Sequence, residues 1–216
     1  ITIEDPVEYR LPGINQVQVN PATGLTFAQG LRAILRQDPN IVMVGEIRDP
    51  ETAEISVRAA MTGHLMLSTL HTNSAVNAIA RLIDMGVEPF LLASSLNCIV
   101  AQRLVRKVCD RCAVSYRPTA EEERLLEEHG MADANLKHGR GCRHCGNTGY
   151  RGRTAIHEVL TMDDTLRGLI LQKRPDHEYL AHALRNGMVP MLKDGLGKAA
   201  AGLTTISELF RVWSAE

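Results

Sequence analysis

The fold of this 216-residue chain is decided by the stretch Asn40-Ile41-Val42-Met43-Val44-Gly45-Glu46-Ile47-Arg48-Asp49. The apolar run from Ile41 to Val44 is rich in β-branched residues and does not alternate, which is typical of a strand buried on both faces of a parallel sheet. Glu46 follows this run at once, and ligands of open α/β sheets bind beyond the carboxyl ends of the strands. The stretch therefore predicts a carboxylate placed to hold Mg²⁺, directly or through water. A plain core strand followed by a capped helix is the alternative.

Strands and helices are predicted to alternate on both sides of this stretch. Asp49 is a typical N-cap, Pro50 suits the first helical position, and Glu51 puts negative charge in the first turn. Further helices are predicted at residues 26–36, 74–85, 89–105, 119–129, 163–173, 176–186, 190–201 and 206–213, and further strands at residues 1–3, 16–19, 65–70 and 154–160. Such alternation indicates an α/β fold with right-handed βαβ units and a parallel sheet, which the strand at 154–160 is expected to rejoin. Cys98 is expected in the core.

Charged and polar residues stand at the ends of these predicted strands. The first strand is followed by Glu4, Asp5 and Glu8, and the strand at 65–70 lies between His64 and His71. Three carboxylates so close together are costly unless a cation, arginines or water compensates them. The alternatives are a solvated acidic turn and ordinary structural histidines.

Arginines offer the matching positive charge. Arg32 and Arg36 lie one helical turn apart and present two cations from one face of the helix at 26–36. Taken by itself, the pattern of this pair favours an ordinary solvated helix face.

Four of the five cysteines form two Cys-x-x-Cys pairs: Cys109 with Cys112, and Cys142 with Cys145. Each pair can place two thiolates on one ion, and together they complete a closed tetrahedral site of four sulfurs, which is structural rather than catalytic. We expect one Zn²⁺ there, and this spacing favours a metal over disulfides. Four free buried cysteines are the alternative.

The overall charge argues against a nucleic-acid partner or an anionic membrane surface. Lys and Arg number 24 against 25 Asp and Glu, which gives a net charge of -1. Residues 136–153 are basic, but Tyr150 is their only aromatic residue, so they lack a stacking platform for bases. No apolar stretch is long enough to span a bilayer.

Several of these motifs together resemble a known family. They are Thr2-Ile3-Glu4-Asp5-Pro6-Val7-Glu8, the stretch from Asp38 to Asp49, Thr62-Gly63-His64, Thr69-Leu70-His71-Thr72, and the cysteine pairs with Gly-Asn-Thr-Gly-Tyr-Arg-Gly-Arg-Thr after Cys145. In this order they resemble the Asp box, Walker B motif, His box and zinc insert of the secretion ATPases. The resemblance is to the assembly ATPases of type II secretion and type IV pilus extension (the GspE/PilB type), and it covers essentially the whole chain.

The resemblance implies an incomplete RecA-like core, a tetracysteine zinc insert and a helical C-terminal part. The expected divisions are residues 1–108 for the core, 109–150 for the insert, and 151–216 for a return strand and helical subdomain. It implies a cytoplasmic ATPase, peripheral to the inner membrane, whose homo-hexamer drives pseudopilus assembly through inner-membrane platform proteins. Type IV pilus extension and a non-enzymatic zinc-stabilised interaction module are the alternatives, and a nucleic-acid-binding zinc protein is disfavoured.

Residue roles follow from the resemblance alone. It implies that Glu8 activates the attacking water, that Glu46 holds Mg²⁺ through its shell, and that His64 and His71 contact the γ-phosphate region. Glu4, Asp5 and Arg48 are expected around the nucleotide and Mg²⁺, and Arg32, Arg36 and Arg81 near the active site or the subunit boundary.

One family motif does not occur in this sequence. No G-x-x-x-x-G-K-[ST] loop is present, and this loop supplies the amides and lysine that hold the phosphates of ATP. Ile1 lies within a predicted strand and is no initiator Met, so the loop is expected upstream in a longer parent. We therefore expect this chain alone to be monomeric or weakly associating and neither to bind Mg-ATP appreciably nor to hydrolyse it.

Overall fold

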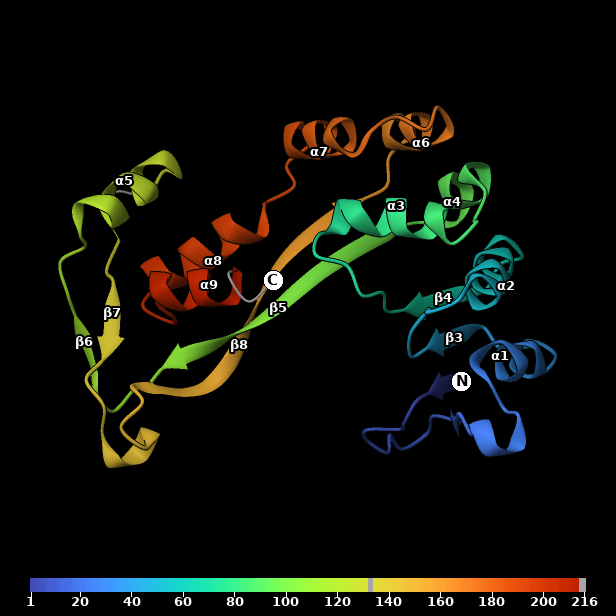
Figure 1. The fold of residues 1–216 in the computed structure, drawn as a ribbon, viewed down its shortest axis with the longest axis horizontal. Coiled ribbons are helices and arrows are strands. Elements are labelled where there is room, and N and C mark those ends of the chain that lie inside the picture. Colours follow the sequence, from blue (N-terminus) through green and yellow to red (C-terminus); the bar gives the residue numbers. More distant parts are fainter. Residues whose placement is uncertain (132–133, 214–216) are drawn as a thin grey trace. The chain divides into compact units, whose positions relative to one another are not determined.

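The computed structural model describes residues 1–131 and 134–213 (Figure 1). The chain divides into two compact units, each made from two stretches: unit 1 from Ile1–Ile99 with Leu160–Ala183, and unit 2 from Val100–Val159 with Leu184–Glu216. The three-part division at residues 108 and 150 stays a prediction, because compactness groups residues by contact and not by role.

A four-stranded parallel sheet lies at the centre of unit 1. Its order is β2-β1-β3-β4, with β1 at Thr2–Glu4, β2 at Gln16–Gln18, β3 at Ile41–Val44 and β4 at Leu65–Ser68. The register pairs Ile3 with Val44, and Val44 with Ser68, so β1, β3 and β4 end next to one another at the same edge. The predicted α/β class with a parallel sheet is confirmed.

Unit 1 also contains helices, and the first two of them connect β2 to β3 and β3 to β4 and pack against the sheet. They are α1 (Phe27–Leu35), α2 (Pro50–Met61), α3 (Ala75–Asp84), α4 (Pro89–Ser95) and α6 (Asp164–Leu171), with α7 (Asp176–Arg185) beginning in this unit and a 3-10 turn at Pro21–Thr23. The N-caps predicted at Thr26 and Asp49 are confirmed, since their side chains accept hydrogen bonds from the N–H groups of Gln29 and Thr52.

In the described part of the chain, one face of the parallel sheet is buried, and the other is partly exposed at β3 and β4 but buried at Thr2 of β1. Val42 and Val44 are fully buried, whereas Ile41, Leu65 and Leu67 are 51%, 48% and 49% exposed. Successive side chains of a strand point to opposite faces, and Ile41 pairs with Leu65, so the exposed residues share one face. The prediction that residues 41–44 are buried on both faces is therefore wrong for Ile41.

The segment that follows α4 is a strand and not a continuing helix. The prediction of one helix over residues 89–105 is wrong: α4 ends at Ser95, Leu96 is extended, and β5 runs over Cys98–Val108. Exposure alternates along most of β5, as expected for a half-buried strand. Cys98 lies on this strand and is exposed, so its predicted place in the core is also wrong.

Unit 2 is organised around the pair of β5 with β8 (Tyr150–Thr161), which forms a separate two-stranded sheet. The strand predicted at 154–160 does not rejoin the parallel sheet. The other elements are β6 (Ala113–Ser115), α5 (Ala120–Glu128), β7 (Lys137–Gly139), a 3-10 turn at Arg143–Cys145, α8 (Met191–Ala200) and α9 (Ile206–Trp213). Val105 of β5, Ile156 of β8, Leu196 of α8 and Leu209 of α9 are buried in one core.

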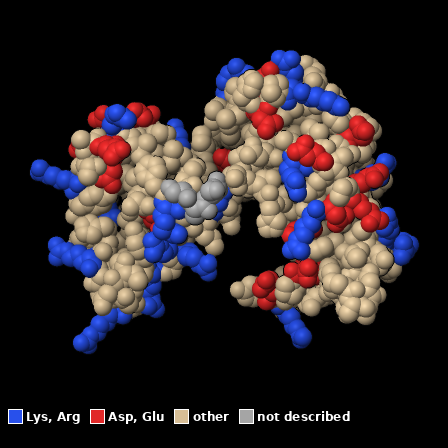
Figure 2. Space-filling view, viewed as in Figure 1, with Lys and Arg blue, Asp and Glu red and all other residues tan. Residues whose placement is uncertain are grey.

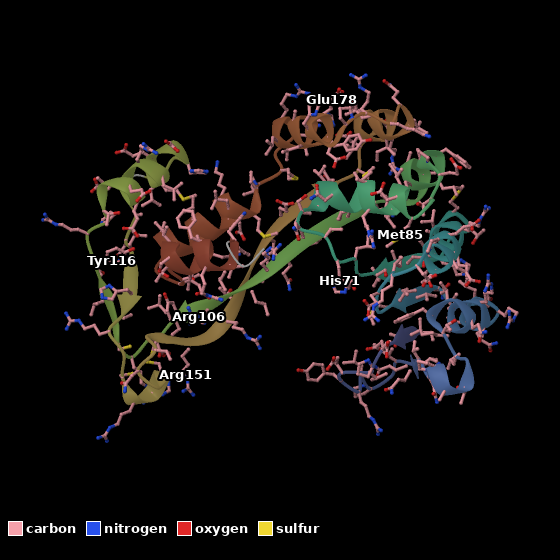
Figure 3. All side chains as sticks on the ribbon, viewed as in Figure 1. His71, Met85, Arg106, Tyr116, Arg151 and Glu178 are labelled. Carbon is pink, nitrogen blue, oxygen red and sulfur yellow. The ribbon has the colours of Figure 1, made fainter. Side chains whose placement is uncertain are left out.

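A buried carboxylate joins β5 to α9 within this core. The Glu208 side chain is fully buried and accepts hydrogen bonds from the backbone N–H of Arg106 at 3.0 Å and its guanidinium Nη2 at 2.6 Å. Arg211 donates to the same carboxylate through Nε at 2.6 Å and Nη2 at 2.7 Å. The Arg106 guanidinium, labelled in Figure 3, also lies 4.3 Å from the centre of the Tyr150 ring. Burial raises the pKa of Glu208, but Arg211 and Arg106 outweigh it and lower the pKa to about 2.

This carboxylate makes unit 2 sensitive to acid. The pKa of Glu208 falls from 4.5 to about 2 on folding. The carboxylate therefore contributes stability that is fully present above about pH 4.5 and is lost as the pH falls towards 2. We expect Glu208→Gln to lower the free energy of unfolding by roughly 2–3 kcal/mol at pH 7 and by much less near pH 2. Urea unfolding from pH 2 to 7 measures this, with Glu123→Gln on α5 as control. A pH-independent difference contradicts it.

Candidate functional site

Three charged side chains and one histidine meet at the carboxyl edge of the parallel sheet. Glu46 lies two residues beyond β3, and its Oε2 is 2.5 Å from Arg48 Nε and 3.0 Å from His71 Nε2. Arg48 Nη1 is also 3.9 Å from Asp5 Oδ2, which lies just beyond β1. Figure 3 shows His71 on the segment between β4 and α3. The structure thus brings together groups that follow three different strands, as parallel pairing of these strands requires.

Charge and burial at this edge favour an ionised Glu46. Its side chain is only 12% exposed, whereas the His71 side chain is 83% exposed. The hydrogen bond from Arg48 has the largest effect and lowers the pKa of Glu46 below 4.5, burial opposes it, and the contact with His71 lowers it further. The site therefore presents a carboxylate that is already ordered by two nitrogen donors. The Glu46 carboxylate can bind a cation either by giving up one of these two hydrogen bonds or by using an oxygen lone pair that they leave free.

The backbone around Glu46 is tied to both neighbouring strands. Gly45 N–H donates to the Ile3 carbonyl at 2.7 Å, and the Gly45 carbonyl accepts from Thr69 Oγ1 at 2.7 Å. Ile47 N–H donates to the Thr69 carbonyl at 3.0 Å. A Cβ at Gly45 would lie 3.2 Å from the Ile3 carbonyl oxygen, so β1 and β3 approach too closely for a larger residue to fit without a shift. The sequence carries no signal for a separate role of Thr69, because the predicted strand at 65–70 includes this residue, whereas β4 ends at Ser68.

The other two acids of the predicted site lie outside this network. Glu4 is partly buried, and its carboxylate accepts hydrogen bonds from Gln16 Nε2 at 3.0 Å and from the Thr2 hydroxyl, which directs it towards β2. Glu8 is exposed in the loop after β1 and takes no part in the contacts of Glu46. The catalytic role expected for Glu8 stays a prediction.

The second histidine lies at the opposite end of β4. His64 directly precedes β4, and its Nδ1 is 3.0 Å from the Ala59 carbonyl oxygen and 3.2 Å from Thr62 Oγ1. These contacts hold it against the last turn of α2. The structure therefore does not bring His64 to Glu46, and its role at the γ-phosphate stays a prediction.

The arginines predicted at the active site or subunit boundary are all on helix surfaces. Arg32 of α1 pairs with Glu51 of α2 at 2.6 Å, and both side chains are about half exposed. Arg36 and Arg81 are exposed at the ends of α1 and α3. None of the three contacts Glu46 in the described part of the chain. Their roles at the site or at a subunit boundary remain predictions.

The four paired cysteines form a single cluster in unit 2. The Sγ atoms of Cys109, Cys112, Cys142 and Cys145 all lie within 4.8 Å of one another. The distances are 3.9 Å from Cys109 to Cys142, 3.9 Å from Cys112 to Cys145 and 3.8 Å from Cys142 to Cys145. Four thiolates bound to one Zn²⁺ at about 2.3 Å stand about 3.8 Å apart, so the donor set fits a tetrahedral ion.

Two glycines allow the cysteine loops to meet. β6 and β7 pair antiparallel, with Ala113 opposite Gly139, and this pairing follows one cysteine loop and precedes the other. Gly149 has a φ of 78°, and a Cβ there would lie 2.5 Å from the Gly139 carbonyl oxygen. The backbone of the second loop can cross β7 only because both residues lack a side chain.

The thiols of this cluster have opposed pKa shifts. Burial raises the pKa of Cys112 to about 12. Burial also raises that of Cys145, but the N–H groups of Cys142 and Gly149 that donate to its sulfur outweigh burial and lower the pKa to about 6. Four thiolates at these distances repel one another unless a cation compensates them, so the cluster can hold a divalent metal of the thiolate-binding kind.

Charges are unevenly distributed on the surface of unit 2. Figure 2 shows acidic side chains gathered over α5, and Lys and Arg side chains projecting around the end that carries the cysteine loops. The segment from Leu136 to Arg153 contains five basic residues and no acid, consistent with this view. Among the helices of the described residues, none is both long and apolar enough to cross a lipid bilayer.

Comparison with known proteins places this geometry in context. Residues 1–211 match the family model described as "Type II/IV secretion system protein". The chain is 54% identical over 213 residues to the type II secretion system protein E of Pseudomonas aeruginosa, covering 98% of this chain and 42% of that protein. It is also 54% identical over 210 residues to the type IV pilus assembly ATPase PilB of Thermus thermophilus, covering 96% of this chain and 24% of that protein.

Solved structures share the fold. The pilus retraction motor PilT with bound ADP superposes with a TM-score of 0.68 at 28% identity, covering 98% of this chain and 51% of that one. The ATPase DotB of Legionella pneumophila has a TM-score of 0.67 at 22% identity, a likeness of fold alone. The chain spans about half the length of these structures, and less than half the length of the two relatives above.

Proposed function

The chain belongs to the family of type II/IV secretion system proteins, and on that premise we propose that it is part of a cytoplasmic ATPase that powers type II protein secretion. The parent would hydrolyse ATP as a homo-hexamer and drive pseudopilus assembly through platform proteins of the inner membrane. The observation that carries this proposal is the meeting of Glu46, Arg48, His71 and Asp5 at one sheet edge. A non-enzymatic interaction module has no need for such a cluster.

The proposed chemistry divides between these residues and Glu8. Phosphoryl transfer depends on positioning and on stabilising charge, so each side chain acts by holding a group in place. Glu46 would hold Mg²⁺ through its shell, and Mg²⁺ supplies charge neutralisation at the phosphates. His71 would donate its Nε2 hydrogen to the γ-phosphate region, and Arg48 would keep Glu46 oriented. Glu8, which is not among the hydrogen-bond and ion-pair partners of Glu46 in the described residues, would accept a proton from the attacking water.

The core is proposed to be RecA-like and incomplete in this stretch of sequence. Two observations support this: the sequence contains no phosphate-binding loop, and Ile41, Leu65 and Leu67 are about half exposed on one face of the parallel sheet. Parallel sheets normally have helices on both faces. The parent is proposed to complete the sheet and to supply the loop.

Pilus extension is the second candidate. The identity to the pilus assembly ATPase equals that to the secretion protein, at 54% each. Both candidates share the hydrolytic site and differ in the pilin that is assembled. Complementation of a strain lacking the secretion ATPase, and of one lacking the pilus ATPase, distinguishes them, and we expect restored secretion in the first.

The active-site assignment is tested in a full-length protein that carries this sequence. We expect Glu8→Gln to lower kcat for ATP hydrolysis by roughly 10²- to 10⁴-fold with little change in nucleotide affinity, because it removes only the proton acceptor. Glu46→Gln should lower kcat and raise the Mg²⁺ concentration needed. Glu54→Gln is the control, since Glu54 pairs with Arg58 on the surface of α2. Near-normal ATP hydrolysis by both Glu8→Gln and Glu46→Gln would contradict the proposed active site.

This chain by itself is proposed to be inert towards nucleotide. Isothermal calorimetry with Mg-ATP should show no binding at micromolar concentration, because the phosphate cradle is missing from the sequence. A dissociation constant in the micromolar range would overturn this proposal.

The tetracysteine cluster is proposed to hold one structural Zn²⁺. Metal analysis of reduced, freshly purified protein should give one equivalent of zinc, and Cys142→Ser should lose it. Because the ligands close the loops of unit 2 and none belongs to unit 1, the variant should lose order around β6 and β7 while amide signals of the parallel sheet persist. Cys98→Ser is the matched control. Zinc well below one equivalent in the unmodified chain would contradict the proposal.

A further inference from the structure

We propose that Thr69 is a positioning residue for the site, which fixes the segment bearing Glu46 against the segment bearing His71. For what the site does, this inference rests on the proposed function. The hydrogen bonds of Thr69 to Gly45 and Ile47, on which the inference is based, do not depend on the proposed function.

The need for such a residue follows from where the sheet ends. Pairing of β3 with β4 stops at Val44 and Ser68, and Glu46 and His71 both lie beyond this last pair. Past the end of a ladder, two chain segments have no regular hydrogen bonds to hold them parallel. His71 is 83% exposed, so packing does little to hold its side chain near Glu46.

Thr69 extends the pairing past this point with two hydrogen bonds. Its carbonyl accepts from Ile47 N–H at 3.0 Å, and its hydroxyl donates to the Gly45 carbonyl at 2.7 Å. Gly45 and Ile47 are the two neighbours of Glu46 in sequence, so Thr69 holds the backbone on both sides of the carboxylate. These hydrogen bonds go to the backbone and to neither the carboxylate nor the imidazole, so Thr69 acts through their placement.

The hydroxyl is the part of Thr69 that a substitution can remove cleanly. On its other side Gly45 is already fixed to β1, because its N–H is bonded to the Ile3 carbonyl at 2.7 Å. The hydroxyl of Thr69 completes the restraint from the side of β4. Valine has nearly the same shape without the donor, whereas serine keeps the donor. Thr69 is exposed, so neither substitution disturbs the core.

The placement is tested on this chain by the pKa of the Glu46 carboxyl group, measured by NMR. The His71 contact contributes to lowering that pKa. We expect Thr69→Val to raise the pKa towards 4.5 by no more than His71→Ala does, and to have a smaller effect in the His71→Ala background. Thr69→Ser should restore the wild-type value. An unchanged pKa in Thr69→Val, or additive effects of the two changes, would overturn the inference.

The consequence for catalysis is tested in the full-length protein. We expect Thr69→Val to lower kcat for ATP hydrolysis about tenfold at unchanged nucleotide KM, with recovery in Thr69→Ser, because a small misplacement of a reacting group is costly. Glu54→Gln is the unaffected control. If Glu8→Gln and Glu46→Gln leave hydrolysis intact, the proposed function fails. If Thr69→Val still raises the pKa of Glu46 in that case, the positioning role of Thr69 stands. If Glu8→Gln and Glu46→Gln abolish hydrolysis and Thr69→Val changes neither kcat nor pKa, the positioning fails alone.

Discussion

The backbone of Gly45 joins three strand ends of the parallel sheet, and the arrangement of the site depends on it. Its N–H is bonded to β1 and its carbonyl to Thr69 beyond β4, both at 2.7 Å, while no side chain would fit without a shift of β1. The next residue is Glu46. Parallel pairing brings the strand ends to one edge, where Asp5, Glu46 and His71 share one network, and the missing side chain at Gly45 allows the close approach of β1 to β3.

Unit 2 is held together by a different kind of interaction. The buried Glu208 carboxylate ties β5 to α9 through Arg106 and Arg211, and Tyr150 connects this cluster to the end of the second cysteine loop. The four sulfurs close that loop against the first one. Unit 1 thus carries the cluster of Asp5, Glu46, Arg48 and His71 at the edge of its sheet. The ion pairs and the cysteine cluster of unit 2 instead connect its elements to one another. This division agrees with a structural rather than a catalytic role for a four-sulfur metal site.

The features that local chemistry dictates could be predicted from the sequence. The caps at Thr26 and Asp49, the parallel sheet and the cysteine cluster each follow from short patterns with one dominant physical cause. The exposure of Ile41 could not be predicted, because it depends on what covers that face of the sheet. The apolar run after Pro89 fits a helix or a strand equally well, and only its pairing with β8 decides for β5. The Arg106–Glu208 contact joins residues 102 positions apart, which no local pattern reveals.

The proposed function requires that Glu46 and His71 face the metal and the phosphates of a bound nucleotide. The most direct measurement is a structure of the full-length protein with Mg²⁺ and a non-hydrolysable ATP analogue. The Glu46 carboxylate should lie within about 4–5 Å of the ion, the reach of one metal-bound water, with His71 in hydrogen-bond contact with the γ-phosphate. A nucleotide bound elsewhere, with Glu46 far from the ion and His71 far from any phosphate, would contradict the proposed function.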